Sequence, residues 1–581
     1  MTNTRTRSGR LERPEIDVVI LGSGIAGTAL AAVLARGGAK VQILDAGQHP
    51  RFAIGESTIP YTSMLMRLVG ERYDVQEFKQ LTTFHNAQAN ITRNGGIKKN
   101  FGFLYHREGR PQIPEESHEF PIPKVTHTEN HFFRQDLDAW LLNVALGHGA
   151  KVRQQAKITE VDFDDAGVTV FSDTGETWRA RYVVDASGFR SPVAARHNLR
   201  ETPSRLRHHS RSIFTHMTGV TPYEETVPDG TFNSYHKWSE GTLHHVFDGG
   251  WLWVIPFNNH PRATNPLVSV GLQVDPRIHP AAEGLTPEQE FRQFADRFPN
   301  IRKQFATARP VREWISTGRL QYSPTQTVGH RYCLTSHAAG FIDPLFSRGM
   351  SNTFEIINGL AWRLLDALRE DDFSVERFEP VQELEQGQLD FNDNLVANAY
   401  TSFSSFELWD SWCRVWALGQ FLATMEINRA YAKLLNTGDH SVLGPLEKIA
   451  PYGALPDYPP LRTLYTQVSD TVQDVAEGRR QHLDAANTIM NLLTSADFVP
   501  PVGLGDPDCR YFGISLTGAR KSMKWAKNDA PEFVGTLMHE GLTMFIKHRL
   551  DRSEYNLAEE FRHALSSRKR LGARLRIPTA R

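Results

Sequence analysis

Cysteine is scarce in this chain. Cys333, Cys413 and Cys509 are the three cysteines among 581 residues. An odd and widely spaced set argues against a disulfide framework and against a zinc cluster. The chain also has no HExxH or CxxC pattern, so we expect no metal site and a reducing, cytoplasmic location.

An excess of charge of one sign is absent too. Lys and Arg number 65 against 66 Asp and Glu, so nothing global favours nucleic acid or an anionic membrane as a partner. The amino terminus has no apolar core like that of a secretory signal. The uncharged run 18–35 approaches membrane-span length, but a GSGIAG interruption within it predicts a strand, a tight turn and a helix instead.

The glycine turn is the first positive signal. A buried strand over 18–21 precedes it and a helix over 28–36 follows it, as in a dinucleotide-binding βαβ unit. The glycines allow the turn, the approach of a pyrophosphate and close packing of helix on strand. A second strand ends at Asp45, whose carboxylate can accept ribose hydroxyls. The turn residues expected to bind the cofactor are Gly22, Gly24, Ile25, Ala26 and Gly27.

An aromatic segment, WLWVIP at 251–256, narrows the class of flavoprotein. Two indoles and a proline on one extended run can wall a pocket, although a half-buried strand with two core tryptophans explains the hexapeptide equally well. The pattern WxWxIP resembles the hallmark of the flavin-dependent halogenases. This resemblance implies that Trp251, Trp253, Ile255 and Pro256 line the substrate pocket and keep the substrate away from the reduced flavin.

Further segments resemble the same family in the same order along the chain. Arg51 and Ser57 lie in a stretch similar to PRxxxGES, Arg134 begins an RxxLD helix start, and Asp185 lies in DASG. The resemblance assigns all four to FAD. A later segment, 339–350, is similar to the second flavin motif DPxxSxG, in which Asp343, Pro344, Gly349 and Met350 would contact the cofactor. One departure is that Ser336 and His337 replace the Gly-Asp of many relatives.

The same loop is where the resemblance places the halide. Successive backbone N–H groups can form an anion nest, and here Ser347, Arg348 and Gly349 would supply it. Lys98 lines up with the family lysine that hydrogen-bonds hypohalous acid or becomes a chloramine. Alternatively, Lys98 and Lys99 lie on a solvated strand edge; adjacent strand residues point to opposite faces, so at most one can enter the interior.

The residue at position 346, a phenylalanine, indicates the class of substrate. Tryptophan halogenases carry a glutamate there, so this chain favours an arene that brings its own activation, either phenolic or polyketide-derived. Phe346 is therefore a further pocket residue, and Glu56 and Glu355 are candidates for assisting roles or for structural partners of an arginine. Asp275, which ends the predicted strand LVSVGLQVD, is the candidate for a covalent link to FAD or a plain strand-ending residue.

The predicted architecture is α/β. A Rossmann-like FAD-binding module spans 15–375, with an inserted substrate β-sheet at about 80–125 and 200–330, and a C-terminal helical region with a basic tail spans 376–581. Aromatic residues between 400 and 434 fall at helical spacing and are expected in the core. His208-His209 and His244-His245 are expected on strands, where neighbouring side chains diverge and cannot share a metal.

We interpret the chain as an FADH2-dependent halogenase of natural-product biosynthesis that uses O2 and chloride or bromide to halogenate an aromatic small molecule, free or bound to a carrier protein. A second glycine fingerprint for NAD(P)H is missing, so reduced flavin is expected from a separate NAD(P)H-dependent flavin reductase. Two alternatives stay open, an aromatic hydroxylase of the same architecture and a redox-silent flavin-binding scaffold.

Overall fold

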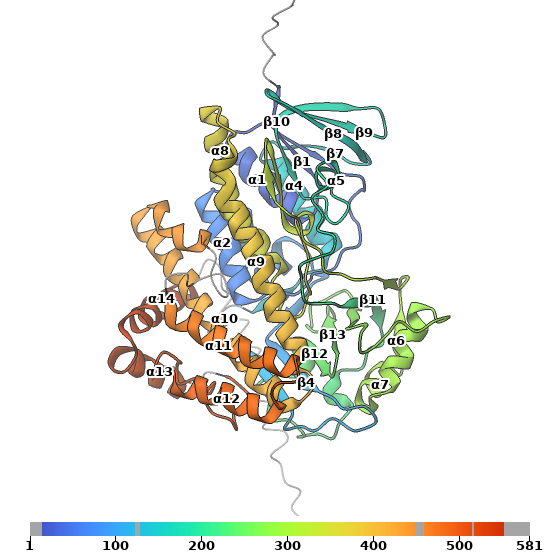
Figure 1. The fold of residues 1–581 in the computed structure, drawn as a ribbon, viewed down its shortest axis with the longest axis vertical. Helices are drawn as coiled ribbons and strands as arrows, with labels where there is room; N and C mark the ends of the chain where they lie inside the picture. The colour runs from blue at the N-terminus through green and yellow to red at the C-terminus, as the bar shows by residue number, and fades with distance from the viewer. Residues whose placement is uncertain (1–13, 123–127, 449–454, 456–457, 514–515, 551–581) are drawn as a thin grey trace, which may run out of the picture.

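The structure, a computed structural model, describes residues 14–122, 128–448, 455, 458–513 and 516–550. Its first layer is a largely parallel sheet, seen at the top of Figure 1. In sheet order its strands are β17 (Val328–Gly329), β18 (Tyr332–Leu334), β10 (Thr177–Asp185), β1 (Ile16–Leu21), β2 (Val41–Leu44) and β7 (Lys151–Arg153). An antiparallel hairpin, β8 (Ile158–Asp164) and β9 (Gly167–Ser172), extends from β10. The apolar run of β1 is buried on both sides, as a central parallel strand requires.

Helix α1 (Ile25–Arg36) follows β1 and packs against α4 (Arg134–Gly147) and α8 (Gly349–Glu370). It begins three residues before the predicted start at Thr28, so Gly27 lies inside its first turn. A Cβ at Gly27 would be 2.0 Å from the carbonyl oxygen of Gly22. The glycine therefore lets the helix begin directly against the turn.

The second sheet is mostly antiparallel and lies at the lower right of Figure 1. In sheet order its strands are β15 (Arg309–Pro310), β11 (Arg211–Thr218), β14 (Val268–Val274), β13 (Gly250–Pro256), β12 (Thr242–Phe247), β4 (Asn100–Tyr105) and β5 (Ser117–Pro121), with β16 (Ile315–Ser316) paired to β11. Trp251 and Trp253 share one face, as predicted, with ring centroids 5.7 Å apart. Nearby, β3 (Gly96–Lys98) and β6 (Glu129–His131) form a separate antiparallel pair.

The two faces of this second sheet have different partners. One hydrophobic cluster joins it to α6 (Pro287–Asp296) and α7 (Pro299–Phe305), through residues such as Leu252 and Val254. The tryptophan face belongs instead to the large cluster that also contains β1 and α1. The period-2 alternation of β13 thus divides its side chains between two cores.

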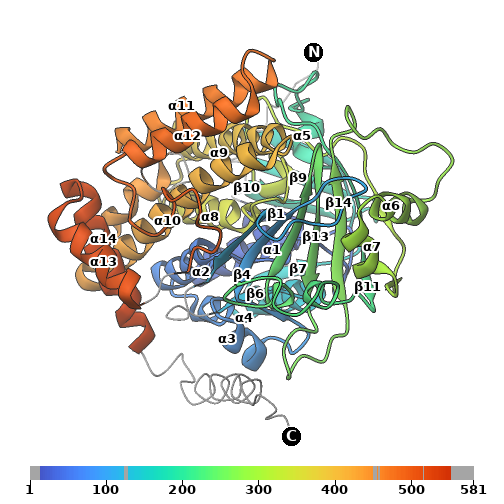
Figure 2. The ribbon, with the colours of Figure 1, turned by 90° about the horizontal axis from the view of Figure 1, so that it is seen from below.

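Helices cover the remaining side of the molecule, as Figure 2 shows for α10 to α14. Trp409, Trp412 and Trp416 of α10 are buried, which confirms their predicted place in the core. The helices of this region are α2 (Pro60–Arg72), α9 (Val375–Ser402), α10 (Phe406–Thr437), α11 (Pro459–Ala476), α12 (His482–Ser495), α13 (Leu516–Asn528) and α14 (Glu532–Leu550). Short elements complete the described chain: η1 (Gln76–Leu81), α3 (Phe84–Asn90), α5 (Pro192–Arg196), η2 (Tyr223–Glu225), η3 (Trp238–Glu240), η4 (Ser336–Ala338) and η5 (His440–Glu447).

The predicted division at 375/376 stays a prediction. The boundary lies close to the junction of two helices, since α8 ends at Glu370 and α9 begins at Val375. However, one hydrophobic cluster runs from α1 across this point to α10, so the helices share a core with the parallel sheet. The predicted basic tail lies outside the described residues.

Candidate active site

The glycine turn after β1 is shaped for an anion. Gly22 has φ +97°, and a Cβ there would be 2.6 Å from the carbonyl oxygen of Ala186. A Cβ at Gly24, by contrast, would meet nothing within 4 Å, and no side chain caps the start of α1 at Ile25 and Ala26. Unpaired N–H groups beside open space at a helix N-terminus fit a phosphate.

Asp45 lies at the end of β2, beside this turn. Its carboxylate accepts hydrogen bonds from the amide and hydroxyl of Ser23, both at 2.6 Å, and forms an ion pair with Arg51. Burial by itself raises the pKa of Asp45, but the hydrogen bonds from Arg51 and Ser23 outweigh it and hold that pKa well below its usual value. Arg51, which we expected beside the flavin, is thus paired with Asp45. The roles of Arg51 and Asp45 in binding FAD stay predictions.

Two further residues assigned to the cofactor also have protein partners. Arg134 forms a bidentate pair with Asp138, with N···O distances of 2.7 and 2.9 Å. Asp185 accepts the hydroxyls of Ser187 and Ser191, both at 2.6 Å. The hydrogen bonds of Asp185 fix the loop after β10. The roles of Arg134 and Asp185 in binding FAD stay predictions.

The second flavin-motif loop, taken here as 336–350, comprises η4, the connection after it and the first residues of α8. Ser347 has φ +53°, and α8 begins at Gly349 without a side-chain cap. A Cβ at Gly349 would meet nothing within 4 Å. The arrangement repeats that of Gly24: free backbone N–H groups beside open space. Of the anion nest predicted for Ser347, Arg348 and Gly349, the Ser347 amide already donates to the Pro344 carbonyl at 3.0 Å, which leaves the amides of Arg348 and Gly349 for an anion.

Asp343, which precedes Pro344 in this loop, holds the loop against the second sheet. The Asp343 carboxylate accepts hydrogen bonds from Gln273 at 2.9 Å, from Ser210 at 3.1 Å, and from Tyr400 at 3.2 Å, and it lies 3.2 Å from His208. His208 and His209 precede β11, so their predicted place on a strand is wrong. Because the stretch 201–210 is a loop, His208 is free to turn toward Asp343.

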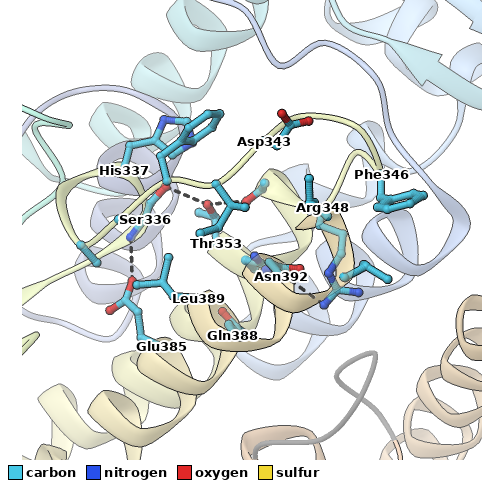
Figure 3. Close-up of a pocket in the computed structure, with 18 residues that line it drawn as sticks. Ser336, His337, Asp343, Phe346, Arg348, Thr353, Glu385, Gln388, Leu389 and Asn392 are labelled. Carbon is cyan, nitrogen blue, oxygen red and sulfur yellow. Dashed lines mark hydrogen bonds between the residues drawn. The ribbon is translucent and has the colours of Figure 1, made fainter. Parts of the chain in front are cut away.

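A cavity of about 70 Å³ opens behind the loop, toward α9. Figure 3 shows three of the residues that line it, Ser336, Thr353 and Glu385 of α9, with Ser336 hydrogen-bonded to the other two. The Ser336 amide donates to Glu385 at 2.9 Å, and its hydroxyl lies 3.0 Å from that of Thr353. Ser336 therefore fastens the loop to α9. Met350, at the start of α8, is buried.

Lys98 is the most unusual side chain of the site. It is 1% exposed, and its Nζ donates to the Ser57 hydroxyl at 2.8 Å and to the Thr58 carbonyl at 2.7 Å. Burial lowers the pKa of Lys98 well below its usual value. Lys99, by contrast, points outward and pairs with Glu240 at 2.8 Å. The solvated-edge alternative is therefore wrong for Lys98, and the prediction that only one of the two lysines enters the interior is confirmed.

An aromatic cluster connects Lys98 to the other predicted pocket residues. The Lys98 Nζ lies 4.1 Å from the centroid of the Phe101 ring, which packs at 5.3 Å on Trp416. Trp416 in turn stacks at 4.9 Å on Phe346 from the second loop. Thus β3, α10 and the flavin-motif loop meet in one place.

The WxWxIP strand borders the same cluster. His244 stacks on Phe101 at 4.5 Å and packs at 5.3 Å on Trp251. Trp253 continues the row, and Ile255 is buried with it. The carbonyl of Pro256 is 2.9 Å from Nδ1 of His131. The structure therefore brings Lys98, Phe346 and the two indoles together in one buried cluster.

Other expected residues lie differently. Glu56 is 3.3 Å from His216. Glu355 accepts from Gln388, and the charge of Arg348 opposes the rise to about 7 that burial causes in the pKa of Glu355; the roles of both glutamates stay predictions. Asp275 pairs with Arg277 at 2.5 Å, and its covalent link to FAD stays a prediction. Sequence reasoning missed Phe101, Glu129 and His244 as site residues; the alternation NFGF at 100–103 was the available signal for the first.

Comparison with known proteins settles the family. Residues 15–289 match a family model described as an FAD binding domain. The tetracycline 7-halogenase of Kitasatospora aureofaciens is 47% identical over 534 residues, which are 90% of this chain and 95% of that protein. The chain belongs to the flavin-dependent halogenases. The monodechloroaminopyrrolnitrin halogenase PrnC of Pseudomonas fluorescens is 44% identical over 89% of this halogenase and 92% of its own length.

A solved structure agrees with these relatives. The halogenase PltM, crystallised with phloroglucinol and FAD, is 38% identical and superimposes with a TM-score of 0.82 over 86% of this halogenase and 99% of PltM. The expected α/β FAD-binding fold with a helical C-terminal region is thereby confirmed, and so are halogenase activity and the use of FAD.

Three further observations concern the described residues of this halogenase alone. None of its helices there is long and apolar enough to cross a membrane. No group of three or more His, Cys, Asp and Glu side chains within those residues is placed to hold a metal ion. The three cysteines are free thiols.

Proposed function

We propose that this enzyme halogenates an electron-rich aromatic, phenolic or polyketide-derived, and that Lys98 handles the hypohalous acid. The observation that carries the proposal is the burial of Lys98 in one aromatic cluster with Trp251 and Phe346. The names of two relatives support the substrate class, since one acts on a tetracycline and another was crystallised with phloroglucinol.

The residues at the two helix N-termini suit a bound FAD. Gly24 leaves room for a pyrophosphate at α1, and Gly349 leaves room at α8. Reduced FAD supplies the chemistry by which O2 oxidises chloride or bromide to hypohalous acid. The amides of Arg348 and Gly349 would hold the halide near that loop, and the hydrogen bonds to Asp343 keep the loop in position.

Lys98 would receive the hypohalous acid at the other end of the cluster. An ammonium group there holds and polarises it, whereas a neutral amine can be halogenated. The aromatic side chains around Phe101 and Trp416 would receive the flat ring of the substrate. Because Phe346 offers no carboxylate, a phenol supplies its own activation. The indoles of Trp251 and Trp253 separate the arene from the flavin, which is positioning rather than redox chemistry.

Two partners complete the proposal. A separate NAD(P)H-dependent flavin reductase would supply FADH2, because the sequence has a single glycine fingerprint. The aromatic substrate is free or bound to a carrier protein. The free thiols of Cys333, Cys413 and Cys509 suit a reducing cytoplasm.

The test supplies reduced FAD, O2 and bromide or chloride together with phloroglucinol as a phenolic probe, and analyses the product by mass spectrometry. We expect replacement of hydrogen by halogen. A product that gains only oxygen would instead show an aromatic hydroxylase. Bound FAD without halide-dependent turnover across a panel of phenols would show a flavin-binding scaffold.

A further inference from the structure

Glu129 occupies the position opposite Lys98. The two residues are register partners in the antiparallel pair of β3 and β6. Side chains at such positions leave the same face of the pair, with Cβ atoms about 5 Å apart. A buried acid therefore faces a buried base across two short strands.

The Glu129 side chain is buried, as is that of Lys98. Glu129 is 3% exposed, and its Oε2 accepts the Ser63 hydroxyl of α2 at 2.6 Å. Thr58 joins the pair, because its carbonyl accepts from Lys98 Nζ at 2.7 Å and its hydroxyl lies near enough to Glu129 to lower the pKa of that carboxyl. Burial raises the pKa of Glu129 to about 7, hydrogen bonds from Ser63 and Thr58 act against that rise, and the Lys98 charge opposes it further.

The other groups around Lys98 carry no compensating charge. Burial lowers the pKa of His131, on β6, and of His244, on β12, to about 3, so both rings are neutral near pH 7. Phe101 of β4 and Ser57 are uncharged. The attraction of Glu129 is the interaction that favours the charged form of Lys98, against the burial that disfavours it.

Lys98 makes two hydrogen bonds, which either the ammonium or the neutral amine form could donate. An ammonium group has three N–H donors, and Lys98 gives two to the acceptors Ser57 and Thr58. The third is left for a ligand such as hypohalous acid. A group in this state polarises its ligand only while it keeps its proton.

We propose that Glu129 is a positioning residue that keeps Lys98 charged as the ammonium form. This proposal rests on the role proposed above for Lys98. Without that carboxylate, Lys98 is a buried cation without a counter-charge, and such a group gives up its proton instead. Glu129 touches neither substrate nor flavin in this account; it acts through Lys98.

The first experiment measures halogenation as a function of pH in wild type and Glu129→Gln. Glutamine keeps the size and the acceptor oxygen but removes the charge. We expect the alkaline limb of the activity profile to move to lower pH by about one unit or more. Glu129→Asp, which keeps the charge, should lie between the two. Glu119→Gln is the matched control, since Glu119 is also buried and hydrogen-bonded, to Asn100 and two backbone amides, but away from Lys98.

The second experiment needs no turnover. Thermal unfolding is compared from about pH 7 to 10 in two pairs: wild type against Lys98→Met, and Glu129→Gln against the double variant K98M/E129Q. With Glu129 removed, the folded pKa of Lys98 falls further below that of the unfolded chain, so the unfolded state binds more protons and stability rises with pH. The Tm of Glu129→Gln relative to the double variant should therefore climb more steeply with pH than the Tm of wild type relative to Lys98→Met.

The two experiments separate the two proposals. Coincident activity profiles of wild type and Glu129→Gln, or equal slopes with pH of the two Tm differences, would overturn the role of Glu129. A wild-type enzyme that makes no halogenated product would overturn the proposed function while the Tm comparison still decides whether Glu129 controls the charge of Lys98.

Discussion

The Nζ of Lys98 lies 4.1 Å from the ring centroid of Phe101, inside the protein. An aromatic face stabilises a nearby cation, the more so where water is excluded. The same ring packs on Trp416, which packs on Phe346 of the flavin-motif loop. This contact therefore links the candidate reactive group to the loop where the halide is expected.

Replacing Lys98 tests its role directly. Lys98→Met keeps the volume of the stem and removes the nitrogen, so we expect halogenation to fall by about 100-fold or more. FAD binding, followed by the flavin absorbance after gel filtration, should persist. The neighbouring variant Lys99→Met removes an outward pair with Glu240 and should leave turnover near wild type. Equal losses in the two variants would refute a special role for Lys98.

The glycine turn distinguishes a structural from a ligand-binding requirement. A Cβ at Gly27 would strike the Gly22 carbonyl at 2.0 Å, whereas one at Gly24 meets no protein atom within 4 Å. We expect Gly27→Ala to lower the Tm and abolish FAD binding. Gly24→Ala should leave the Tm of the apoenzyme unchanged and weaken FAD binding, measured by fluorescence titration. Unaltered affinity in Gly24→Ala would mean that FAD does not use this space.

Gly271 fixes the position of one indole. A Cβ there would lie 2.0 Å from the Trp253 ring, so Gly271→Ala must displace that ring. If the indoles separate the arene from the flavin, the variant should bind FAD normally but release more hypohalous acid per halogenated product. A soluble chlorination scavenger measures that release. An unchanged ratio would argue that Trp253 is only core packing.

Arg414 holds a loop over the aromatic cluster. Its guanidinium is buried and donates to the carbonyls of Asp506 and Cys509, both at 2.7 Å, and to Asp410 at 3.0 Å. Arg414→Met leaves these acceptors unpaired, so we expect a loss of about 3–5 kcal/mol in unfolding free energy. Denaturant titration measures it. Arg480→Met, which removes an exposed pair with Asp484, should change stability by less than about 1 kcal/mol.

The buried histidines predict the response to acid. Burial lowers the pKa of His244 to about 3, so below about pH 6.5 the unfolded chain binds a proton that the folded protein refuses. Stability is therefore present at neutral pH and is lost as the pH falls. Between pH 7 and 4 the loss in His244→Phe should be smaller than in wild type by roughly 3 kcal/mol. Parallel curves of unfolding free energy would contradict this.

The local elements of the fold were predictable because each obeys a local rule. The period-2 pattern of β13 placed Trp251 and Trp253 on one face, and the glycine spacing placed a turn between β1 and α1. The start of α1 was missed by three residues, because the pattern does not show that Gly27 packs on the Gly22 carbonyl.

The site was less predictable, because its contacts join distant segments. Nothing near Lys98 in the sequence indicates that Glu129 is its register partner, since β3 and β6 are separated by two other strands. Likewise, helical spacing predicts that Trp416 is buried but not that it stacks on Phe346. Loop residues such as His208 were misplaced for a related reason: local polarity does not distinguish a loop from a strand end.

The separation of oxidant production from halogen transfer is the central claim. A crystal structure of the enzyme with FAD, bromide and phloroglucinol tests it most directly. The account predicts the phenol ring against Phe101 and within reach of Lys98 Nζ, with the indoles of Trp251 and Trp253 between it and the flavin ring. A phenol stacked directly on the flavin ring would contradict it.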